Sequence, residues 1–417
     1  MKNLKIAVIG SGISGLSSAY YLSQYNKVDI FEKNKYFGGH TNTQKITIDN
    51  KDINVDTGFI VFNSINYPNL CNLFKKLKIQ SYESDMSFSV SNLIEDLEYS
   101  GTNLLSLFSQ KKNLFNWKFL KMLIEIIKFN NSVEKDKKKY KNLTIQDYLD
   151  KKKYSDYYKY QHIFPMAASI WSSNINDIKN YPFEKFVNFF SNHGLLKIFN
   201  RPKWRTVSGG SQSYVNSILS SQNIKSYKNC NVKFLYKKKK KIYLEIFGKQ
   251  KLYDHLIVAT HADQVNEFLL NKNKGKKFFE SIKYTKNSVY LHSDQSLMPK
   301  IKNCWSSWNY LEHSKSTNIT VTYWMNKLQN IQTKKNIFVS LNPSIIPEKR
   351  KTFSKHIYDH PLFDFKTFKN QKLIRSIQGV DNIWYCGAYL GYGFHEDGIN
   401  SAIEVVNKIQ KKYNTND

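Results

Sequence analysis

Arginine is scarce in this chain of 417 residues, although positive charge is not. Lysine and arginine together number 63 against 33 acidic residues, a formal net charge of +30. The arginines are only Arg201, Arg205, Arg350 and Arg375. Base edges and phosphates are read mainly by the guanidinium fork, which lysine lacks. The composition predicts a solvated basic surface and no specific nucleic-acid partner, and it leaves an anionic membrane as the second partner class that the charge suits.

Cysteine and long apolar runs are scarce as well. Cys71, Cys230, Cys304 and Cys386 have no short metal-ligand spacing, so we expect no metal site and no disulfide framework. No run of about 18 apolar residues is present to span a bilayer, and Met1 leads straight into a strand pattern. We therefore expect a cytoplasmic protein, with peripheral contact at the inner face of the cell membrane as the alternative placement.

Apolar and aromatic residues are plentiful enough to build a sizeable core, at 41% and 15% of the sequence. A chain of this length exceeds what one core usually serves, at about 100 to 200 residues per domain. We therefore predict a globular chain of about two domains.

A glycine loop opens the chain, in the stretch KIAVIGSGISGLSSAYYL. Apolar residues 6–9 predict a buried strand, and the residues after the loop predict a helix. Gly10 permits a tight turn, Gly12 lets the backbone approach a pyrophosphate, and Gly15 lets the helix pack on the strand. We predict that a dinucleotide cofactor contacts Gly10, Ser11, Gly12, Ile13, Ser14 and Gly15.

An acidic residue stands where such a cofactor places its adenosine ribose. Glu32 ends the second strand pattern, KVDIFEKN, 17 residues after Gly15. A carboxylate there accepts both ribose hydroxyls and repels a 2′-phosphate, which disfavours NADP and leaves NAD and FAD.

The segment after Glu32 bears a family resemblance. GGHTNT, a hairpin pattern and VDTGF together resemble the FAD-binding fold of the superfamily of flavin-dependent amine oxidases, phytoene desaturases and protoporphyrinogen oxidases. The resemblance implies FAD as cofactor, with further contacts at Lys33, Gly39, His40, Thr41, Thr57, Gly58 and Phe59. His40 replaces an arginine that is common in the superfamily, and both a phosphate donor and an ordinary loop histidine remain open interpretations.

Two later segments resemble the same fold. NVKFLYKKKKKIYLEIFGKQKLYDHLIVATHADQV is similar to the adenine-side insertion, with a backbone contact at Val232. NIWYCGAYLGYGFHEDGINSAIEVVNKIQKKY is similar to the C-terminal segment, with a helix that we expect to begin near Gly398 and to face the flavin. The cofactor contacts implied there are Gly387, Ala388, Asp397, Gly398 and Ile399. Ala388 replaces the usual acid, and Asp397 is either its substitute or a helix N-cap.

These segments define the predicted fold class and domains. We expect an α/β chain with an interrupted Rossmann-like FAD-binding domain of the glutathione-reductase type and an inserted α+β substrate domain. The FAD-binding domain comprises 1–76, 205–285 and 371–417, and the substrate domain comprises 77–204 and 286–370. The aromatic strand patterns CWSSWNY and VTYWMN in the second insert are expected to lie in the core.

Residues 117–129, in NWKFLKMLIEIIKF, predict a helix with a broad apolar face and a thin, mostly basic stripe. A core-packed helix and a helix at a membrane interface are both consistent with this pattern.

A closer resemblance covers nearly the whole chain. PMAASIWSS, TVSGGSQSYV and GAYLGYGFHEDGINSA, with the motifs above, resemble a bacterial group of predicted NAD/FAD-binding oxidoreductases linked to fatty-acyl modification. This resemblance implies hydride transfer from a small-molecule or lipid substrate, such as a membrane acyl chain, to the flavin. Candidate catalytic residues are His395, Glu396 and Tyr392, for which bracing of the loop is the structural alternative. Amine oxidation and a non-catalytic binding role are the alternative functions.

Overall fold

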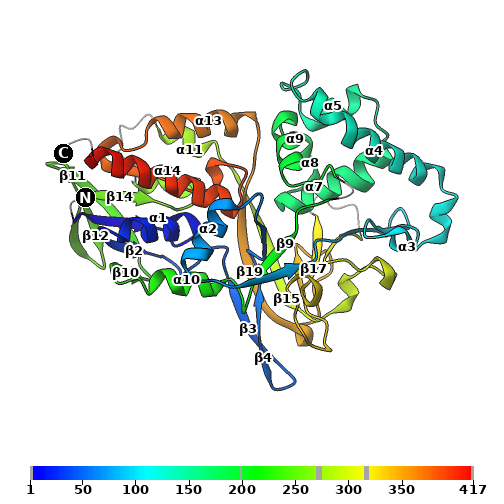
Figure 1. The fold of residues 1–417 in the computed structure, drawn as a ribbon, viewed down its shortest axis with the longest axis horizontal. Helices are drawn as coiled ribbons and strands as arrows, with labels where there is room; N and C mark the ends of the chain where they lie inside the picture. The colour runs from blue at the N-terminus through cyan, green and yellow to red at the C-terminus, as the bar shows by residue number, and fades with distance from the viewer. Residues whose placement is uncertain (1–2, 198–199, 269–274, 314–318, 415–417) are drawn as a thin grey trace.

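The computed structural model describes residues 3–197, 200–268, 275–313 and 319–414 (Figure 1). A five-stranded parallel sheet forms the centre of one half of the molecule. Its strands, in spatial order, are β10 (Ile224–Tyr227), β2 (Lys27–Phe31), β1 (Lys5–Ile9), β14 (His255–Val258) and β20 (Ile383–Tyr385). The apolar runs of β1, β2 and β14 suit such a sheet because its central strands are buried on both faces.

Two different layers cover this sheet. One face packs against the helices α1 (Ile13–Ser23), α2 (Pro68–Lys76), α10 (Gln212–Leu219) and α14 (His395–Asn414). The other face packs against a meander of β11 (Val232–Lys238), β12 (Lys241–Ile246) and β13 (Lys249–Tyr253), and against α11 (Lys276–Glu280). This is the interrupted Rossmann-like α/β architecture that the sequence predicts, because the sheet takes its strands from three separate parts of the chain.

The second half combines a mixed sheet with a cap of helices. The strands, in spatial order, are β19 (Thr352–Pro361), β15 (Tyr284–His292), β18 (Phe338–Leu341), β17 (Thr320–Trp324), β16 (Trp308–Glu312), β7 (Phe88–Asn92) and β8 (Leu97–Ser100). The helices are α3 (Leu104–Leu107), α4 (Trp117–Asp136), α5 (Ile145–Lys151), α6 (Asp156–Tyr158), α7 (Phe164–Trp171), α8 (Ile175–Lys179) and α9 (Phe183–Asn192). In Figure 1 these helices lie at the end of the molecule opposite α1 and β11.

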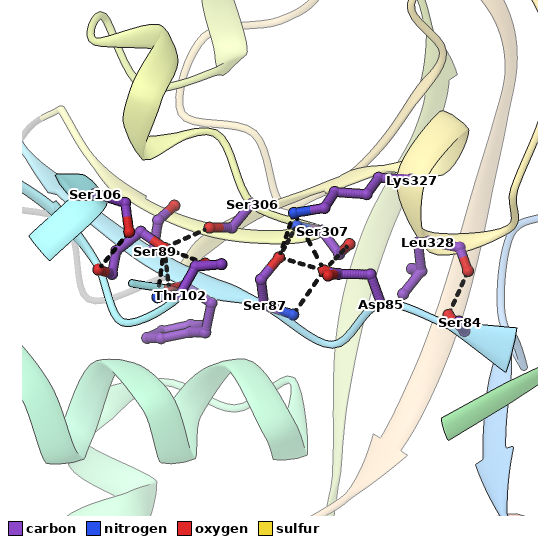
Figure 2. A network of polar contacts seen from close by, with 12 residues as sticks. Ser84, Asp85, Ser87, Ser89, Thr102, Ser106, Ser306, Ser307, Lys327 and Leu328 are labelled. Carbon is purple, nitrogen blue, oxygen red and sulfur yellow. Dashed lines mark hydrogen bonds and ion pairs between the residues drawn. The ribbon is translucent and has the colours of Figure 1, made fainter. Parts of the chain in front are cut away.

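Polar contacts join the two inserted segments into one domain (Figure 2). The carboxylate of Asp85, from the first insert, accepts a hydrogen bond from the Ser307 hydroxyl at 2.7 Å and lies 3.4 Å from the Lys327 ammonium. The Ser100 and Ser306 hydroxyls are bonded at 2.8 Å. Together with the parallel pairing of β7 and β16, these contacts build one sheet from segments about 200 residues apart.

Short elements connect the two halves. The predicted hairpin is β3 (Thr43–Ile48) with β4 (Lys51–Asp56), and a small sheet holds β5 (Val61–Asn63), β9 (Trp204–Val207) and β6 (Ser81–Ser84).

Near the C-terminus, α13 (Phe365–Ser376) crosses the domain limit predicted at 370–371, and its Ile374 packs in the core of the Rossmann-like half. None of the helices in the described residues has the length and apolarity that crossing a membrane requires.

Candidate cofactor and substrate site

One cavity of about 480 Å³ is lined by residues of both halves. Its polar end is formed by the glycine loop between β1 and α1 and by the strand ends around it. The predicted cofactor residues that line it are Gly10, Ser11, Gly12, Ile13, Ser14, Glu32, Lys33, Gly39, His40, Thr57, Gly58, Phe59, Val232, Gly387 and Ala388. The structure therefore brings three distant parts of the chain to one cavity, as a dinucleotide site requires.

Gly12 and Gly15 of the loop have different structural roles. Gly12 is the N-cap of α1, and a Cβ built on it would meet no atom within 4 Å. A Cβ on Gly15 would overlap the carbonyl oxygen of Gly10 and lie 3.2 Å from the Cβ of Ala259. Gly12 thus leaves space at the cavity for a ligand, whereas Gly15 allows α1 to pack against the sheet and does not line the cavity.

Glu32 lies at the carboxyl end of β2, beside the glycine loop. One carboxylate oxygen accepts hydrogen bonds from the Ser11 amide at 3.0 Å and the Ser11 hydroxyl at 2.7 Å. The other accepts from the Asn34 amide at 2.9 Å. The chain's own donors therefore orient this acceptor at the cavity wall, where a ribose hydroxyl is expected.

Three histidines from distant segments gather around the cavity. The ring of His40 lies 5.1 Å from that of His360 and 6.0 Å from that of His261. Burial, and then its histidine neighbours, lower the pKa of His40 well below the ordinary value. Its Nε2 has no hydrogen-bond partner within the described part of the chain. A neutral imidazole with a buried, unpaired nitrogen therefore lies at the position where the resemblance expects an arginine.

Many buried histidines in one protein make stability depend on pH. Burial lowers the pKa of His162, His193, His255, His292 and His360 to about 4 and that of His395 to about 3. The unfolded chain, with histidine pKa values of 6.5, then binds more protons between pH 6.5 and pH 4, so stability falls as the pH falls. Burial raises the pKa values of Asp56 and Asp397 to about 6, so these two groups make stability rise as the pH falls. They are fewer than the histidines.

We therefore expect the melting temperature, followed by circular dichroism, to fall by on the order of 10 °C between pH 7 and pH 5. A melting temperature that stays level or rises over this interval would show that the histidines are hydrated and ordinary.

The C-terminal helix begins earlier than the sequence predicts. α14 starts at His395, so Asp397 is its third residue, and the carboxylate accepts from the Phe394 amide at 2.9 Å. The Gly398 amide is already bonded to the Phe394 carbonyl at 3.1 Å, and a Cβ on Gly398 would lie 2.6 Å from Ile13. Asp397, Gly398 and the buried Ile399 do not line the cavity. Within the chain the Asp397 carboxylate caps the helix and the Gly398 amide is used by the helix itself, and the flavin contacts of the three residues stay predictions.

The structure also places Glu396 and Thr41 outside the lining of the cavity, where both side chains bond to other parts of the chain. Glu396 accepts from the Asn69 and Leu70 amides at 2.9 and 3.0 Å, which caps the start of α2, and its side chain does not line the cavity. This placement favours the structural role over the catalytic one. Thr41 lies behind the cavity wall, where its hydroxyl bonds Tyr214 at 2.5 Å and the Nε2 of His395 at 3.1 Å.

His395 and Tyr392, two of the candidate catalytic residues, line the cavity. The His395 ring stacks on Phe59 with centroids 3.7 Å apart. Burial lowers its pKa to about 3, so it is neutral at pH 7 and a weak base. This environment suits a residue that positions Phe59 at the cavity wall, with Thr41 behind it, better than one that takes up a proton.

The sequence did not reveal the substrate end of the cavity. Trp308 and Tyr323, which the strand patterns assigned to the core, pack in or against the core and also line the cavity, where they meet edge to face at 4.9 Å. Core and cavity walls share one alternating pattern, so the sequence offered no signal for them. For His261 the sequence did offer a signal, because this residue follows β14 at the carboxyl edge of the parallel sheet, where ligands bind.

Among the described residues no cluster of side chains is arranged to hold a metal ion.

The residues at the polar end fit a dinucleotide cofactor. The open space at Gly12 and the unpaired Nε2 of His40 lie at the same cavity as Glu32. Backbone amides at the start of α1 suit a diphosphate, and Glu32 suits a ribose. Val232 and Thr260 line the cavity beside the meander, where an adenine base would lie.

Comparisons with known proteins agree with this geometry. Residues 8–77 match the model of the NAD(P)-binding Rossmann-like domain, and no curated protein matches the chain in sequence. Solved structures match over nearly the whole chain. One, named as a protoporphyrinogen oxidase from Exiguobacterium sp. 255-15, has a TM-score of 0.71 and 13% identity over 99% of this chain and 100% of that chain. This chain has the same fold.

Two other structures show the same likeness. A fatty acid isomerase from P. acnes that produces CLA has a TM-score of 0.66 and 12% identity over 98% of this chain and 99% of that chain. Cyclohexylamine oxidase from Brevibacterium oxydans IH-35A has a TM-score of 0.66 and 12% identity over 98% of this chain and 100% of that chain. The likeness at this identity is one of fold, and it extends through both halves of the molecule.

Proposed function

We propose that this protein is an FAD-dependent oxidoreductase that oxidises a lipid-like substrate. The observation that carries the proposal is that one cavity joins a dinucleotide site to an aromatic chamber. FAD, when bound, supplies a two-electron acceptor for hydride from the substrate. The chain itself then has to hold the cofactor, orient the substrate and keep water from the reacting atoms.

The chamber supports an apolar substrate. Its walls come from both inserted segments and are mainly aromatic and aliphatic, among them Phe88, Met166, Ile170, Trp171, Phe189, Trp308, Tyr323, Val339, Leu341 and Phe363. Apolar side chains that face a cavity favour a ligand that removes their surface from water. An extended acyl chain has this chemistry, so removal of hydrogen from a fatty acyl chain is the reaction that we propose.

Three polar side chains of the chamber carry hydrogen-bond donors only. The indole nitrogens of Trp171 and Trp308 are buried and have no partner among the described residues. Arg201 lines the same chamber and is exposed, and its Nε donates to the Lys197 carbonyl at 2.7 Å. Donors of this kind suit a carboxylate or ester oxygen and oppose a protonated amine.

The two named relatives with contrasting substrates bear on this choice. The isomerase from P. acnes acts on a fatty acid and cyclohexylamine oxidase acts on an amine, and both have this fold. We favour the first chemistry because Arg201 lines the chamber, although Asp359, whose Oδ1 has no hydrogen-bond partner among the described residues, also lines the cavity and interacts with His261 and Tyr284.

Anaerobic reduction of the bound flavin tests the proposal. Long-chain fatty acids or acyl lipids should bleach the flavin absorbance, and aliphatic or aromatic amines should not. Reduction by amines alone would replace the proposed substrate class, and reduction by none of them, with dithionite still effective, would contradict the proposed activity on lipids.

Arg201 offers a sharper test of substrate choice. We expect Arg201→Gln to raise KM for a fatty acid by about 10- to 100-fold, since a charge-assisted hydrogen bond is worth about 1.5–3 kcal/mol, and to leave kcat nearly unchanged. Steady-state kinetics checks this. Lys203→Gln is the matched control, because Lys203 is exposed, pairs with Glu83 at 3.2 Å and does not line the cavity. Equal KM values in the parent and Arg201→Gln would refute the contact.

A further inference from the structure

The segment from α3 through the first half of α4 carries exposed apolar side chains that no other part of the described chain covers. They are Leu104, Leu105, Leu114, Phe115, Trp117, Leu120, Ile124 and Ile127, which we call the 104–127 surface. Phe115 is 90% exposed, Leu105 is 83% exposed, and Trp117 and Ile124 are each 67% exposed. Exposed apolar side chains that gather on one surface mark an interaction site.

Helix α4 is apolar on two faces. Phe119, Met122, Phe129 and Val133 are fully buried against the helical cap. Trp117, Leu120, Ile124 and Ile127 recur at the same helical spacing on the opposite side and remain exposed. Packing of the fold explains the first face only, because a helix at the surface of a globular protein ordinarily presents polar residues outward. The second face requires another explanation.

The exposed charges on α4 beside this surface are basic, whereas next to the preceding segment Lys112 pairs with the exposed Asp96. Lys118 and Lys128 on α4 are exposed, and the Lys121 ammonium lies 5.3 Å from the centre of the Trp117 ring. The one acidic residue between Trp117 and Val133 is Glu125, which is buried and accepts from the Ser155 amide at 2.9 Å and its hydroxyl at 2.5 Å. The acid is thus turned inward, and lysines alone flank the exposed apolar residues of the helix.

We propose that the 104–127 surface docks on an anionic lipid layer. Apolar side chains enter the boundary between headgroups and acyl chains, and lysines beside them attract the anionic headgroups. Charge complementarity favours this occupant over a second copy of the chain, since self-pairing of this surface would bring lysines together. α3 and α4 lie at the end of the molecule away from α1 and α14 (Figure 1), so docking leaves the cofactor end free. The inference does not depend on the proposed function.

Sedimentation with vesicles tests the proposal on the full-length protein. We expect binding to vesicles that contain phosphatidylglycerol, little binding to pure phosphatidylcholine, and weaker binding as salt is raised. Leu105→Ser/Phe115→Ser/Ile124→Ser should lower the bound fraction at least about tenfold. These residues are exposed, so the melting temperature should stay within a few degrees of the parent. Lys118→Gln/Lys121→Gln should weaken binding to the anionic vesicles and reduce its salt dependence.

Ile65→Ser/Ile346→Ser is the matched control, because these residues are 68% and 64% exposed and lie on other elements. It should bind vesicles like the parent. Equal sedimentation of the triple variant and the parent overturns the proposal. It is also overturned if gel filtration shows an oligomer that only the triple variant dissociates while vesicle binding is unchanged, since the surface then joins two copies of the chain.

Discussion

Replacing Gly12 by valine is expected to abolish FAD binding while the fold persists. Gly12 has a φ of −68° and a ψ of 179°, a conformation that valine adopts readily, and a Cβ there would meet no protein atom within 4 Å. The new side chain would therefore occupy the cavity where a diphosphate approaches the start of α1. We expect the affinity for FAD to fall by at least about 100-fold, because the backbone amides lose access to the anion.

Flavin absorbance of the purified variant and titration of its apoprotein with FAD measure this effect. The far-ultraviolet circular dichroism should match the parental apoprotein, and the melting temperature should fall only by the share that the bound cofactor contributes. Gly101→Val is the matched control, since a Cβ at Gly101 also meets no atom within 4 Å and Gly101 does not line the cavity. Parental FAD content in Gly12→Val would refute the placement of the cofactor at this loop.

Replacing Gly15 by valine is expected to do the reverse and to damage the fold itself. A Cβ at Gly15 overlaps the Gly10 carbonyl oxygen, a backbone atom that moves only if α1 shifts away from the sheet. The start of α1 also packs against α14, where a Cβ on Gly398 would already crowd Ile13 and Ser14. Overpacking of this kind costs on the order of 3 kcal/mol or more when backbone is involved.

Denaturant unfolding of apoproteins isolates this effect from cofactor loss. The unfolding midpoint of Gly15→Val should lie well below that of the parent without FAD, or the variant should be recovered only in aggregates. An apoprotein of Gly15→Val that unfolds at the parental midpoint would contradict the packing role. The two valine variants together separate the ligand space at Gly12 from the helix contact at Gly15.

Local patterns of the sequence predicted the architecture well. The β1–loop–α1 unit, the β3–β4 hairpin, the β11–β13 meander and the helix at 117–129 each have a signal within a short window of residues. The carboxyl edge of the parallel sheet then places the glycine loop and Glu32 together, because the strand ends of such a sheet lie along one side.

The start of α14 was predicted three residues too late. The loop GYGFHEDG offers Gly398 as an apparent boundary, yet Asp397 accepts from the Phe394 amide and so extends the helix back to His395. Capping by a carboxylate at the third residue of a helix depends on a single hydrogen bond, which the composition of the segment does not reveal. The Gly398 amide therefore bonds to the Phe394 carbonyl within the helix.

The histidine cluster lay beyond sequence patterns because its members come together only in the fold. His40 follows the second glycine pair, His261 follows β14, and His360 lies on β19 in the seven-stranded sheet. Burial lowers the pKa values of all three, and neighbouring histidines lower those of His40 and His360 further, an effect of tertiary structure alone. The chamber walls show the same limit, since Trp308 lines a cavity and Tyr310, two residues on, packs in the core.

The identity of the cofactor released on denaturation tests the central claim most directly. The purified protein should be yellow, and heat or acid should release FAD in stoichiometric amount, identified by chromatography and fluorescence. Release of FMN or NAD in its place would contradict the account. So would a colourless protein that fails to bind added FAD, because the cavity at Gly12, Glu32 and His40 would then hold some other ligand.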